Sequence, residues 1–218
     1  MENEIREQLS WYGKKIIEKG LAAGPGGNIS AKDEDFVYLS PSGFALDEIG
    51  HQQWVKLNIK TGNVEGLKPT CEVSMHLGCY LARKEIKAVI HTHPPLTLAL
   101  ICAGREFKAF CPDFVALLGK KVPVIPYVIP SGEEIRKAVV EQIKKYNVVL
   151  LKNHGVVCVG ESLKEAFSRS WLIEESARTI LYGTLLGKFR YLNKKEIDDI
   201  DHLPAEDFRR TLLKSAKK

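Results

Sequence analysis

The sequence predicts one α/β domain in which a mixed or antiparallel sheet lies between helices. Apolar patterns typical of helices and of strands alternate along the 218 residues. Turn residues between two strand-like runs, as in Asn153-His154-Gly155, indicate hairpins, which a purely parallel sheet does not contain. We find no internal repeat and no linker. Residues 1–218 are therefore expected to form a single domain, with 193–218 as a short helical C-terminal segment.

The first third of the chain is expected to contain one helix and several short strands. Ile5, Leu9, Tyr12 and Ile16 recur at helical spacing, and Gly20 is a typical stop signal. The glycine-rich segment 20–30 is predicted to be a loop. Short apolar or alternating runs predict strands at 36–39 and 54–59, and Lys60-Thr61-Gly62-Asn63 is a plausible hairpin turn before Val64.

The rest of the chain alternates between the two kinds of element. Thr70 can cap a helix whose apolar positions are Val73, Leu77, Tyr80 and Leu81. A buried strand is predicted to end at Pro94-Pro95, since proline removes a ladder hydrogen bond. The same patterns predict helices at 96–103, 133–146, 161–186 and, as one or two short pieces, 194–215, and strands at 122–125 and on both sides of residues 153–155.

Composition excludes several classes of protein. Hydrophobic residues make up 44% of the chain and charged residues 27%, which is typical of a globular protein. The net charge of +5 suits an anionic ligand, but nucleic-acid binders carry a denser basic stripe, so no nucleic acid is expected as a partner. The five cysteines form no Cys-x-x-Cys pair, which favours reduced thiols in the cytoplasm. No signal peptide and no apolar run long enough for a membrane span is recognised, so no membrane partner is expected.

Three histidines are the first candidates for chemistry. In a strand, residues i and i+2 point to the same face, so His91 and His93 converge; this spacing fits a metal site and a pair of strand histidines bonded to carbonyls about equally. His154 favours the metal site, although an isolated Asn-His-Gly is more often an exposed turn. Gly155 is expected to permit a positive φ and so to aim the His154 ring. Three imidazoles with an open fourth position form a catalytic rather than a structural zinc site.

Glu72 and His76 lie four residues apart at the start of a predicted helix and share one helical face. Glu72 is a candidate general acid/base, or both residues are candidate metal ligands. The alternative is that Glu72 is a first-turn carboxylate favoured by the helix dipole. We expect His76 to be a hydrogen-bonded structural histidine outside the metal shell.

Three polar loops could together bind an anion. They are Gly27–Ser30, Ser40–Gly43 and Thr70-Cys71, and each offers backbone N–H groups and small polar side chains. Each by itself is equally an ordinary turn. No Walker or Gly-x-Gly-x-x-Gly spacing is present, so the sequence does not support nucleotide binding.

These motifs, taken in order, resemble the class II aldolase/adducin-head family over about residues 5–187. The matching segments are GGNIS, SPSG, TCEVSMH, AVIHTHPP and KNHG, followed by a long helix. The resemblance implies a three-layer α/β/α sandwich with a central, mainly antiparallel sheet, and a homotetramer with sites at subunit interfaces. It further implies that Zn²⁺, or another divalent metal, binds His91, His93 and His154, and that Glu72 is the acid/base. A phosphate site is implied at Gly27, Asn28, Ser42, Gly43, Thr70 and Cys71.

The activity implied by the resemblance is that of a zinc-dependent aldehyde-lyase. It would cleave a small phosphorylated sugar, a ketose 1-phosphate such as L-fuculose 1-phosphate, to dihydroxyacetone phosphate and an aldehyde through an enediolate. The alternatives within the family are an L-ribulose-5-phosphate 4-epimerase and a methylthioribulose-1-phosphate dehydratase. A non-catalytic adducin-like binding module is a weaker alternative, because it predicts loss of the histidines and of Glu72.

Two departures from the family pattern affect the expected proton donors and phosphate contacts. Cys71 stands where the family commonly has a small hydroxyl residue. The middle loop, Phe110-Cys111-Pro112-Asp113, and the segment after 192 contain no tyrosine, although aldolases of the family use tyrosines from both. Asp113 falls where the epimerases carry an acid, and it is the candidate second proton donor. Those epimerases, however, normally have Asp at the position of Glu72.

Overall fold

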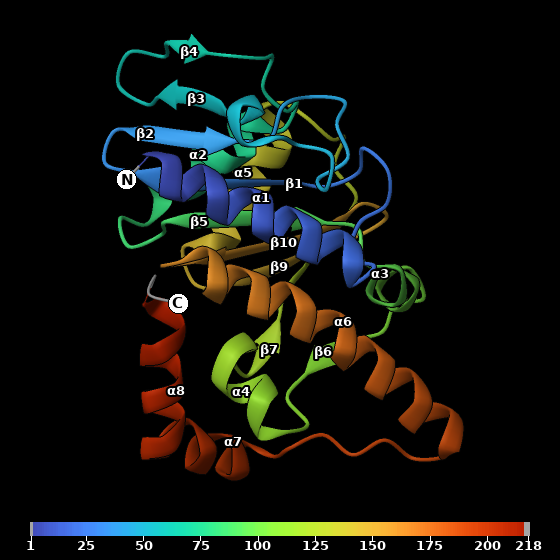
Figure 1. Cartoon of the computed structure of the whole chain (residues 1–218). Coiled ribbons are helices and arrows are strands. Elements are labelled where there is room, and N and C mark those ends of the chain that lie inside the picture. Colours follow the sequence, from blue (N-terminus) through green and yellow to red (C-terminus); the bar gives the residue numbers. More distant parts are fainter. Residues whose placement is uncertain (1, 216–218) are drawn as a thin grey trace.

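A central eight-stranded sheet with helices on both faces forms the body of the chain (Figure 1). The structure is a computed structural model and describes residues 2–215. The strands of this sheet are β1 (Asn28–Asp33), β2 (Phe36–Leu39), β3 (Val55–Asn58), β4 (Val64–Glu65), β5 (Ala88–Thr92), β8 (Val124–Ile125), β9 (Val148–Leu151) and β10 (Gly155–Gly160). A separate two-stranded sheet pairs β6 (Phe107–Lys108) with β7 (Lys121–Val122).

The helices alternate with these strands along the chain. They are α1 (Glu2–Glu18), the 3₁₀ turn η1 (His51–Gln53), α2 (Val73–Ala82), α3 (Pro95–Cys102), α4 (Pro112–Leu118), α5 (Glu133–Ile143), α6 (Leu163–Leu186), α7 (Lys194–Asp201) and α8 (Pro204–Lys214). Among the described residues, no helix combines the length and the apolar character that crossing a bilayer requires. The helices expected near 133–146 and 161–186 are confirmed as α5 and α6, with α5 ending three residues earlier.

The sheet is mixed, in the order β4-β3-β2-β1-β5-β10-β9-β8. Antiparallel pairing joins β1 to β2 and to β5, and joins β10 to β5 and to β9, whereas β8 pairs with β9 in parallel. The parallel pair arises because α5 carries the chain from the end of β8 back to the start of β9. The mainly antiparallel sheet implied by the family resemblance is corrected to a mixed one.

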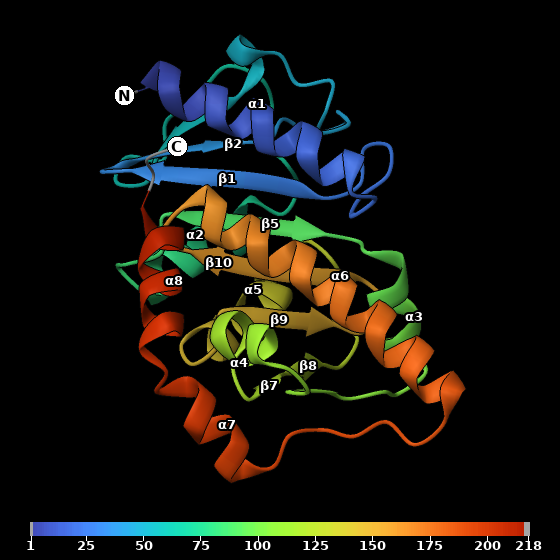
Figure 2. The same cartoon turned by 60° about the horizontal axis from the view of Figure 1, so that its bottom comes forward.

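Apolar side chains fill the space between the sheet and the helices on both of its faces. On one face, Met75 and Cys79 of α2 and Val139 of α5 pack against strand residues such as Val89 and Val157. On the other face, α1 and α6 run side by side across the strands (Figure 2) and bury Leu9, Ile16 and Ala166 against Ile29 and Ile90. Strand residues therefore alternate between two buried faces, which explains the near-continuous apolar runs of β5 and β10.

Three elements differ from the sequence-based expectations. The segment 20–30 is not loop throughout, because residues from Asn28 onwards form β1 between β2 and β5. The helix predicted after Thr70 has Glu72 as its N-cap, and Leu81 is 65% exposed rather than on the apolar face. The strand predicted at 122–125 is divided between the two sheets at Pro123, which has no N–H to donate to a ladder.

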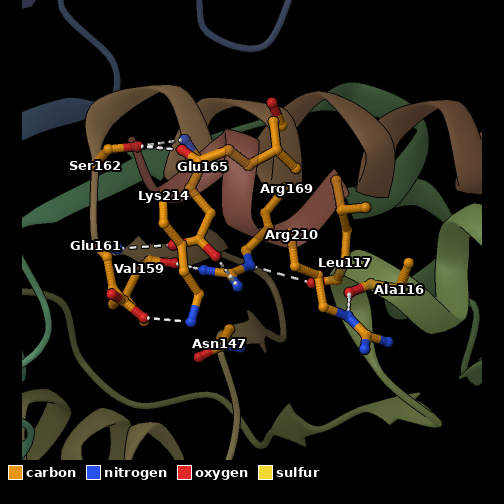
Figure 3. Close-up of polar contacts among 12 residues, drawn as sticks. Ala116, Leu117, Asn147, Val159, Glu161, Ser162, Glu165, Arg169, Arg210 and Lys214 are labelled. Carbon is orange, nitrogen blue, oxygen red and sulfur yellow. Dashed lines mark hydrogen bonds and ion pairs between the residues drawn. The ribbon is translucent and has the colours of Figure 1, made fainter. Parts of the chain in front are cut away.

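Polar contacts join α8 to α4 and to the residue Glu161 before α6, next to the buried Arg169 (Figure 3). Arg169 is buried, donates to the carbonyls of Leu117 and Val159, and pairs with Glu165 at 2.7 Å. Arg210 of α8 donates to the Ala116 carbonyl at 3.1 Å, and Lys214 pairs with Glu161 at 2.7 Å. Helices α7 and α8 confirm the expected short helices at 194–215, and the last three residues of the predicted 193–218 segment lie outside the described residues.

Candidate functional site

The three histidines meet at one end of the sheet, beside the start of α3. His91 lies on β5, His93 follows that strand, and His154 lies in the turn between β9 and β10. Strands β5 and β10 are antiparallel neighbours, with Val157 opposite His91, so the end of one strand meets the start of the other. One ring nitrogen from each histidine lies within 4.8 Å of the other two. The structure thus brings together the three residues that the sequence singles out.

Glycines allow the rings to approach this closely. A Cβ atom on Gly155 would lie 2.4 Å from the carbonyl oxygen of Thr92 and 2.6 Å from Cδ2 of His93. A Cβ on Gly27 would lie 2.9 Å from the His91 carbonyl oxygen. The positive φ in this turn belongs to Asn153, at 58°, and not to Gly155. The sequence therefore identifies the glycine for the wrong reason: the position needs space for two histidines rather than a left-handed backbone.

The histidine rings are held in a neutral state. Burial lowers the pKa of His91 well below its ordinary value, and the neighbouring His93 and His154 lower it further. Burial also lowers the pKa values of His93 and His154, and the Glu72 carboxylate opposes that shift in both. Neutral imidazole is the form that binds a metal, so the site is prepared for one without having to release protons.

One close contact at the centre of the cluster, between His91 and Glu72, has no proton to share. His91 Nδ1 lies 3.0 Å from the Val156 carbonyl, which can only accept, so the single N–H of the neutral ring is used there. Its Nε2 lone pair then faces Glu72 Oε2 at 3.1 Å and His93 Nε2 at 3.0 Å. Among the described residues, Glu72 Oε1 and His154 Nδ1 are also buried without a hydrogen-bond partner. The lone pairs of His91 Nε2 and Glu72 Oε2 face each other, and a cation bound by the histidines would relieve this contact.

Glu72 reaches the cluster from the start of α2, which packs on the face of the sheet that also carries the side chains of Val89 and Val157. It is the N-cap residue of α2, is 5% exposed, and its Oε1 lies 3.4 Å from His154 Nε2. The carboxamide of Asn28, at the start of β1, donates to Glu72 Oε2 at 2.9 Å. The carboxylate is therefore both in contact with the histidines and fixed by a neighbour, so its place at the helix start serves more than the helix dipole.

His76 lies outside the metal cluster, as the sequence predicts. It is fully buried, its Nε2 lies 2.5 Å from Asn28 Oδ1, and its Nδ1 lies 2.7 Å from Ser30 Oγ. Burial lowers the pKa of His76 to about 3, so the ring is neutral at physiological pH. The i, i+4 spacing from Glu72 places both side chains against Asn28.

The three polar loops lie next to one another beside the start of β1. Pro41 and Pro69 form a β-bridge, the Ser42 N–H donates to the Lys68 carbonyl, and the Thr70 N–H donates to the Ser40 carbonyl. The Thr70 hydroxyl accepts from the Glu72 N–H at 3.3 Å, which is the kind of contact expected of a capping residue, although Glu72 is the N-cap of α2. Ser42, Gly43 and Cys71 are exposed, whereas Thr70 and Asn28 are buried.

Asp113 is the one candidate site residue whose contacts point elsewhere. It lies in the first turn of α4 and pairs with Arg209 of α8 at 2.6 Å. In the described part of the chain its contacts involve neither Glu72 nor the three histidines.

One buried acid near the site has no counterpart among the sequence-based candidates. The Glu174 carboxylate, from α6, accepts from the Leu96 and Thr97 N–H groups and from the Thr97 hydroxyl at 2.7–3.0 Å. It thereby caps α3, which begins two residues after His93. The partners are separated by 77 and 78 residues, so no local pattern could indicate this contact.

Comparison with known proteins places the chain among sugar-phosphate enzymes. The family model for the class II aldolase and adducin N-terminal domain matches residues 7–181. The 5-deoxy-D-ribulose 1-phosphate aldolase of Bacillus thuringiensis serovar kurstaki is 33% identical over 89% of this chain and 92% of its own. The 3-oxo-tetronate 4-phosphate decarboxylase of Pectobacterium atrosepticum is 32% identical over 91% and 93%. A solved L-fuculose 1-phosphate aldolase has a TM-score of 0.84 and 29% identity, covering 94% of this chain and 96% of its own.

Proposed function

The chain belongs to the class II aldolase and adducin N-terminal domain family, and on this premise we propose that it is a zinc-dependent aldehyde-lyase. Its substrate is a short ketose 1-phosphate, L-fuculose 1-phosphate or a near relative. Its products are dihydroxyacetone phosphate and an aldehyde. The observation that carries the proposal is the cluster of His91, His93 and His154, whose nitrogens lie within 4.8 Å of one another, in contact with Glu72.

The three histidines are the proposed zinc ligands. When bound, zinc supplies a Lewis acid beside the oxygens on which negative charge develops during cleavage of the carbon–carbon bond. Neutral imidazoles leave the charge of the ion intact, and three protein ligands leave a position open. The retained ligands and acid also argue against a non-catalytic adducin-like module.

Glu72 is the proposed acid/base. Retro-aldol cleavage removes a proton from the hydroxyl of the departing aldehyde and later returns one to the carbon of the enediolate. Glu72 suits both transfers, because Oε2 is held by Asn28 and Oε1 accepts no hydrogen bond from the described residues. A positioned carboxylate of this kind contributes a rate factor of about 10²–10⁴.

The adjoining loops are the proposed phosphate site. The N–H groups of Ser42 and Thr70 are used within the loops, whereas no bond within residues 2–215 occupies those of Gly43 and Cys71. We therefore assign the main phosphate contacts to these two N–H groups, to the Ser42 hydroxyl and to the backbone at Gly27. At Cys71 a backbone contact survives the replacement of a hydroxyl by a thiol. Asn28 contributes through its backbone, because its carboxamide is already paired.

We further propose that the protein is a cytoplasmic homotetramer. Each subunit is then a single three-layer sandwich domain, with residues 193–218 as a helical C-terminal segment. Among the described residues Asp113 pairs with Arg209 and contacts neither Glu72 nor the three histidines, so the second proton donor role that we propose for it is at the site of a neighbouring subunit. Gel filtration with light scattering tests the assembly, and a monomeric active enzyme would remove Asp113 from the mechanism.

A decarboxylase is the second candidate, because a relative of that name is as similar to this chain as the aldolase relative. Loss of carbon dioxide from a 3-oxo-tetronate 4-phosphate and loss of an aldehyde from a ketose 1-phosphate leave the same enediolate of dihydroxyacetone phosphate. The two reactions need the same metal, acid and phosphate contacts. They differ in the leaving group, which is carbon dioxide in one and an aldehyde in the other. The middle loop 110–113 and the segment after 192 lack the tyrosines that aldolases of the family use as proton donors, and this affects the release of an aldehyde. An epimerase and a dehydratase are further alternatives on the same site.

The deciding experiment incubates the zinc-loaded protein with dihydroxyacetone phosphate and a panel of aldehydes, with and without chelator. We expect condensation that the chelator stops and zinc restores. Release of carbon dioxide from 3-oxo-tetronate 4-phosphate, measured in parallel, identifies the decarboxylase instead. Condensation that resists the chelator, or a protein that binds no zinc, would overturn the proposal.

A further inference from the structure

We propose that His76 is a positioning residue that orients the Glu72 carboxylate through a buried hydrogen-bond chain running from Tyr80 through Ser30, His76 and Asn28. The inference rests on the proposed function only in taking Glu72 as the acid/base. It gives a role to three buried polar residues that neither the metal cluster nor the phosphate loops use.

The chain is continuous and excludes solvent. Tyr80 Oη lies 2.6 Å from Ser30 Oγ, which lies 2.7 Å from His76 Nδ1. His76 Nε2 lies 2.5 Å from Asn28 Oδ1, and Asn28 Nδ2 lies 2.9 Å from Glu72 Oε2. Ser30 and His76 are fully buried, and Tyr80, Glu72 and Asn28 are at most 6% exposed. Two elements build the chain: Asn28 and Ser30 lie on β1, and His76 and Tyr80 lie on α2.

Only one arrangement of protons satisfies every link. An ionised carboxylate accepts hydrogen bonds only, so Asn28 must present its amide nitrogen to Glu72 and its carbonyl to His76. His76 must then carry its proton on Nε2. Because the ring is neutral, Nδ1 has only a lone pair and accepts from the Ser30 hydroxyl, which accepts from Tyr80 in turn. Every donor therefore points toward Glu72.

This arrangement separates the two oxygens of the carboxylate. Oε2 receives the Asn28 amide, while Oε1 has no hydrogen-bond partner among the described residues and faces His154. If Asn28 turned over, its carbonyl oxygen would lie against Oε2 and repel it. The His76 N–H prevents this turn, because a reversed amide would place a donor against a donor. Removing that N–H should leave Glu72 less precisely placed without touching a metal ligand.

Three variants of α2 test the role with the full-length, zinc-loaded protein. His76→Leu removes the N–H donor, and His76→Gln keeps an amide N–H near the place of Nε2. Cys79→Ala is the control, because it changes another fully buried side chain of α2 that is not part of the hydrogen-bond chain. We expect His76→Leu to lower kcat about 10–100-fold with an almost unchanged KM and one zinc per subunit. His76→Gln should recover most of the loss, and Cys79→Ala should keep wild-type kcat. Wild-type kcat in His76→Leu, or His76→Gln as slow as His76→Leu, would overturn the inference.

A second measurement requires no turnover and applies even if His76→Leu fails to fold. In protein labelled with ¹⁵N-histidine, the resonances missing from the spectrum of His76→Gln belong to His76. We expect Nε2 to be protonated and Nδ1 not, with no change between pH 8 and pH 5. A proton on Nδ1 would reverse the chain and refute the inference. If the protein shows the expected tautomer but acts on no phosphorylated substrate, the proposed function is refuted and the hydrogen-bond chain is still supported.

Discussion

Replacing Gly155 by alanine tests whether the close approach of β5 and β10 creates the metal site. The added Cβ would lie 2.4 Å from the Thr92 carbonyl oxygen, 2.6 Å from His93 Cδ2 and 2.9 Å from His91 Cε1, whereas ordinary contact begins at 3.4 Å. The strand or the rings must therefore move by about 1 Å. Overpacking of this size costs about 1–3 kcal/mol of stability. A displacement of about 1 Å at a positioned ligand costs about 100-fold in function.

The assay is a zinc titration against a chromophoric chelator, with urea unfolding of the metal-free protein measured alongside. Gly160→Ala is the matched control, because Gly160 ends the same strand and its Cβ would lie 2.7 Å from the Ala166 nitrogen, far along β10 from the histidines. We expect both variants to lose stability and only Gly155→Ala to lose zinc affinity, by about 10–100-fold. Wild-type zinc affinity in Gly155→Ala would refute the reasoning.

Three further predictions concern the acid/base, pH and the buried ion pair. Glu72→Gln should retain zinc and lose at least about 100-fold in kcat, since it cannot transfer a proton; retained turnover would remove Glu72 from the mechanism. Burial lowers the pKa of His76 from 6.5 to about 3. Between pH 6.5 and pH 3 the unfolded chain therefore binds a proton on this side chain and the folded chain does not. The contribution of His76 to the free energy of unfolding of the metal-free protein should therefore be complete above pH 6.5 and decrease as the pH falls toward 3. A free energy of unfolding by urea that stays constant between pH 6.5 and pH 3 would contradict this. Arg169→Met should cost about 3–5 kcal/mol by leaving Glu165 buried without its cation, whereas Glu161→Gln, in an exposed pair with Lys214, should cost under about 1 kcal/mol in the same unfolding assay.

Only part of the histidine cluster could be predicted from short-range rules. The two-residue period of a strand places His91 and His93 on one face. The position of His154 beside them depends on the pairing of β10 with β5, and only the family resemblance names all three residues. The structure adds the shortage of protons around His91 Nε2, which depends on the Val156 carbonyl, 65 residues away in the sequence.

Contacts between distant segments could not be predicted. Strand β1 begins within the segment 20–30 that the glycine content marks as a loop, because its place in the sheet depends on β2 and β5 rather than on local propensity. The sequence predicts Thr70 as the helix cap; its hydroxyl does accept from the Glu72 N–H, but Glu72 is the N-cap, so the helix begins two residues later than predicted. The parallel pairing of β8 with β9 follows from a crossover through α5. The sequence predicts a strand on each side of this helix, but it does not predict that the two strands are neighbours in the sheet.

The three histidines come from β5, from the residue after it and from the β9–β10 turn. The free zinc concentration would therefore also affect the fraction of the protein that is native. The trio exists only when these segments are assembled, so the proposed zinc would bind the native protein more tightly than the denatured one. Free zinc at 100 times its dissociation constant would raise the free energy of unfolding by about 2.7 kcal/mol, which is about a hundredfold in the denatured fraction. The proposed metal would then protect the native protein from proteolysis by lowering its denatured fraction, in addition to its part in the chemistry.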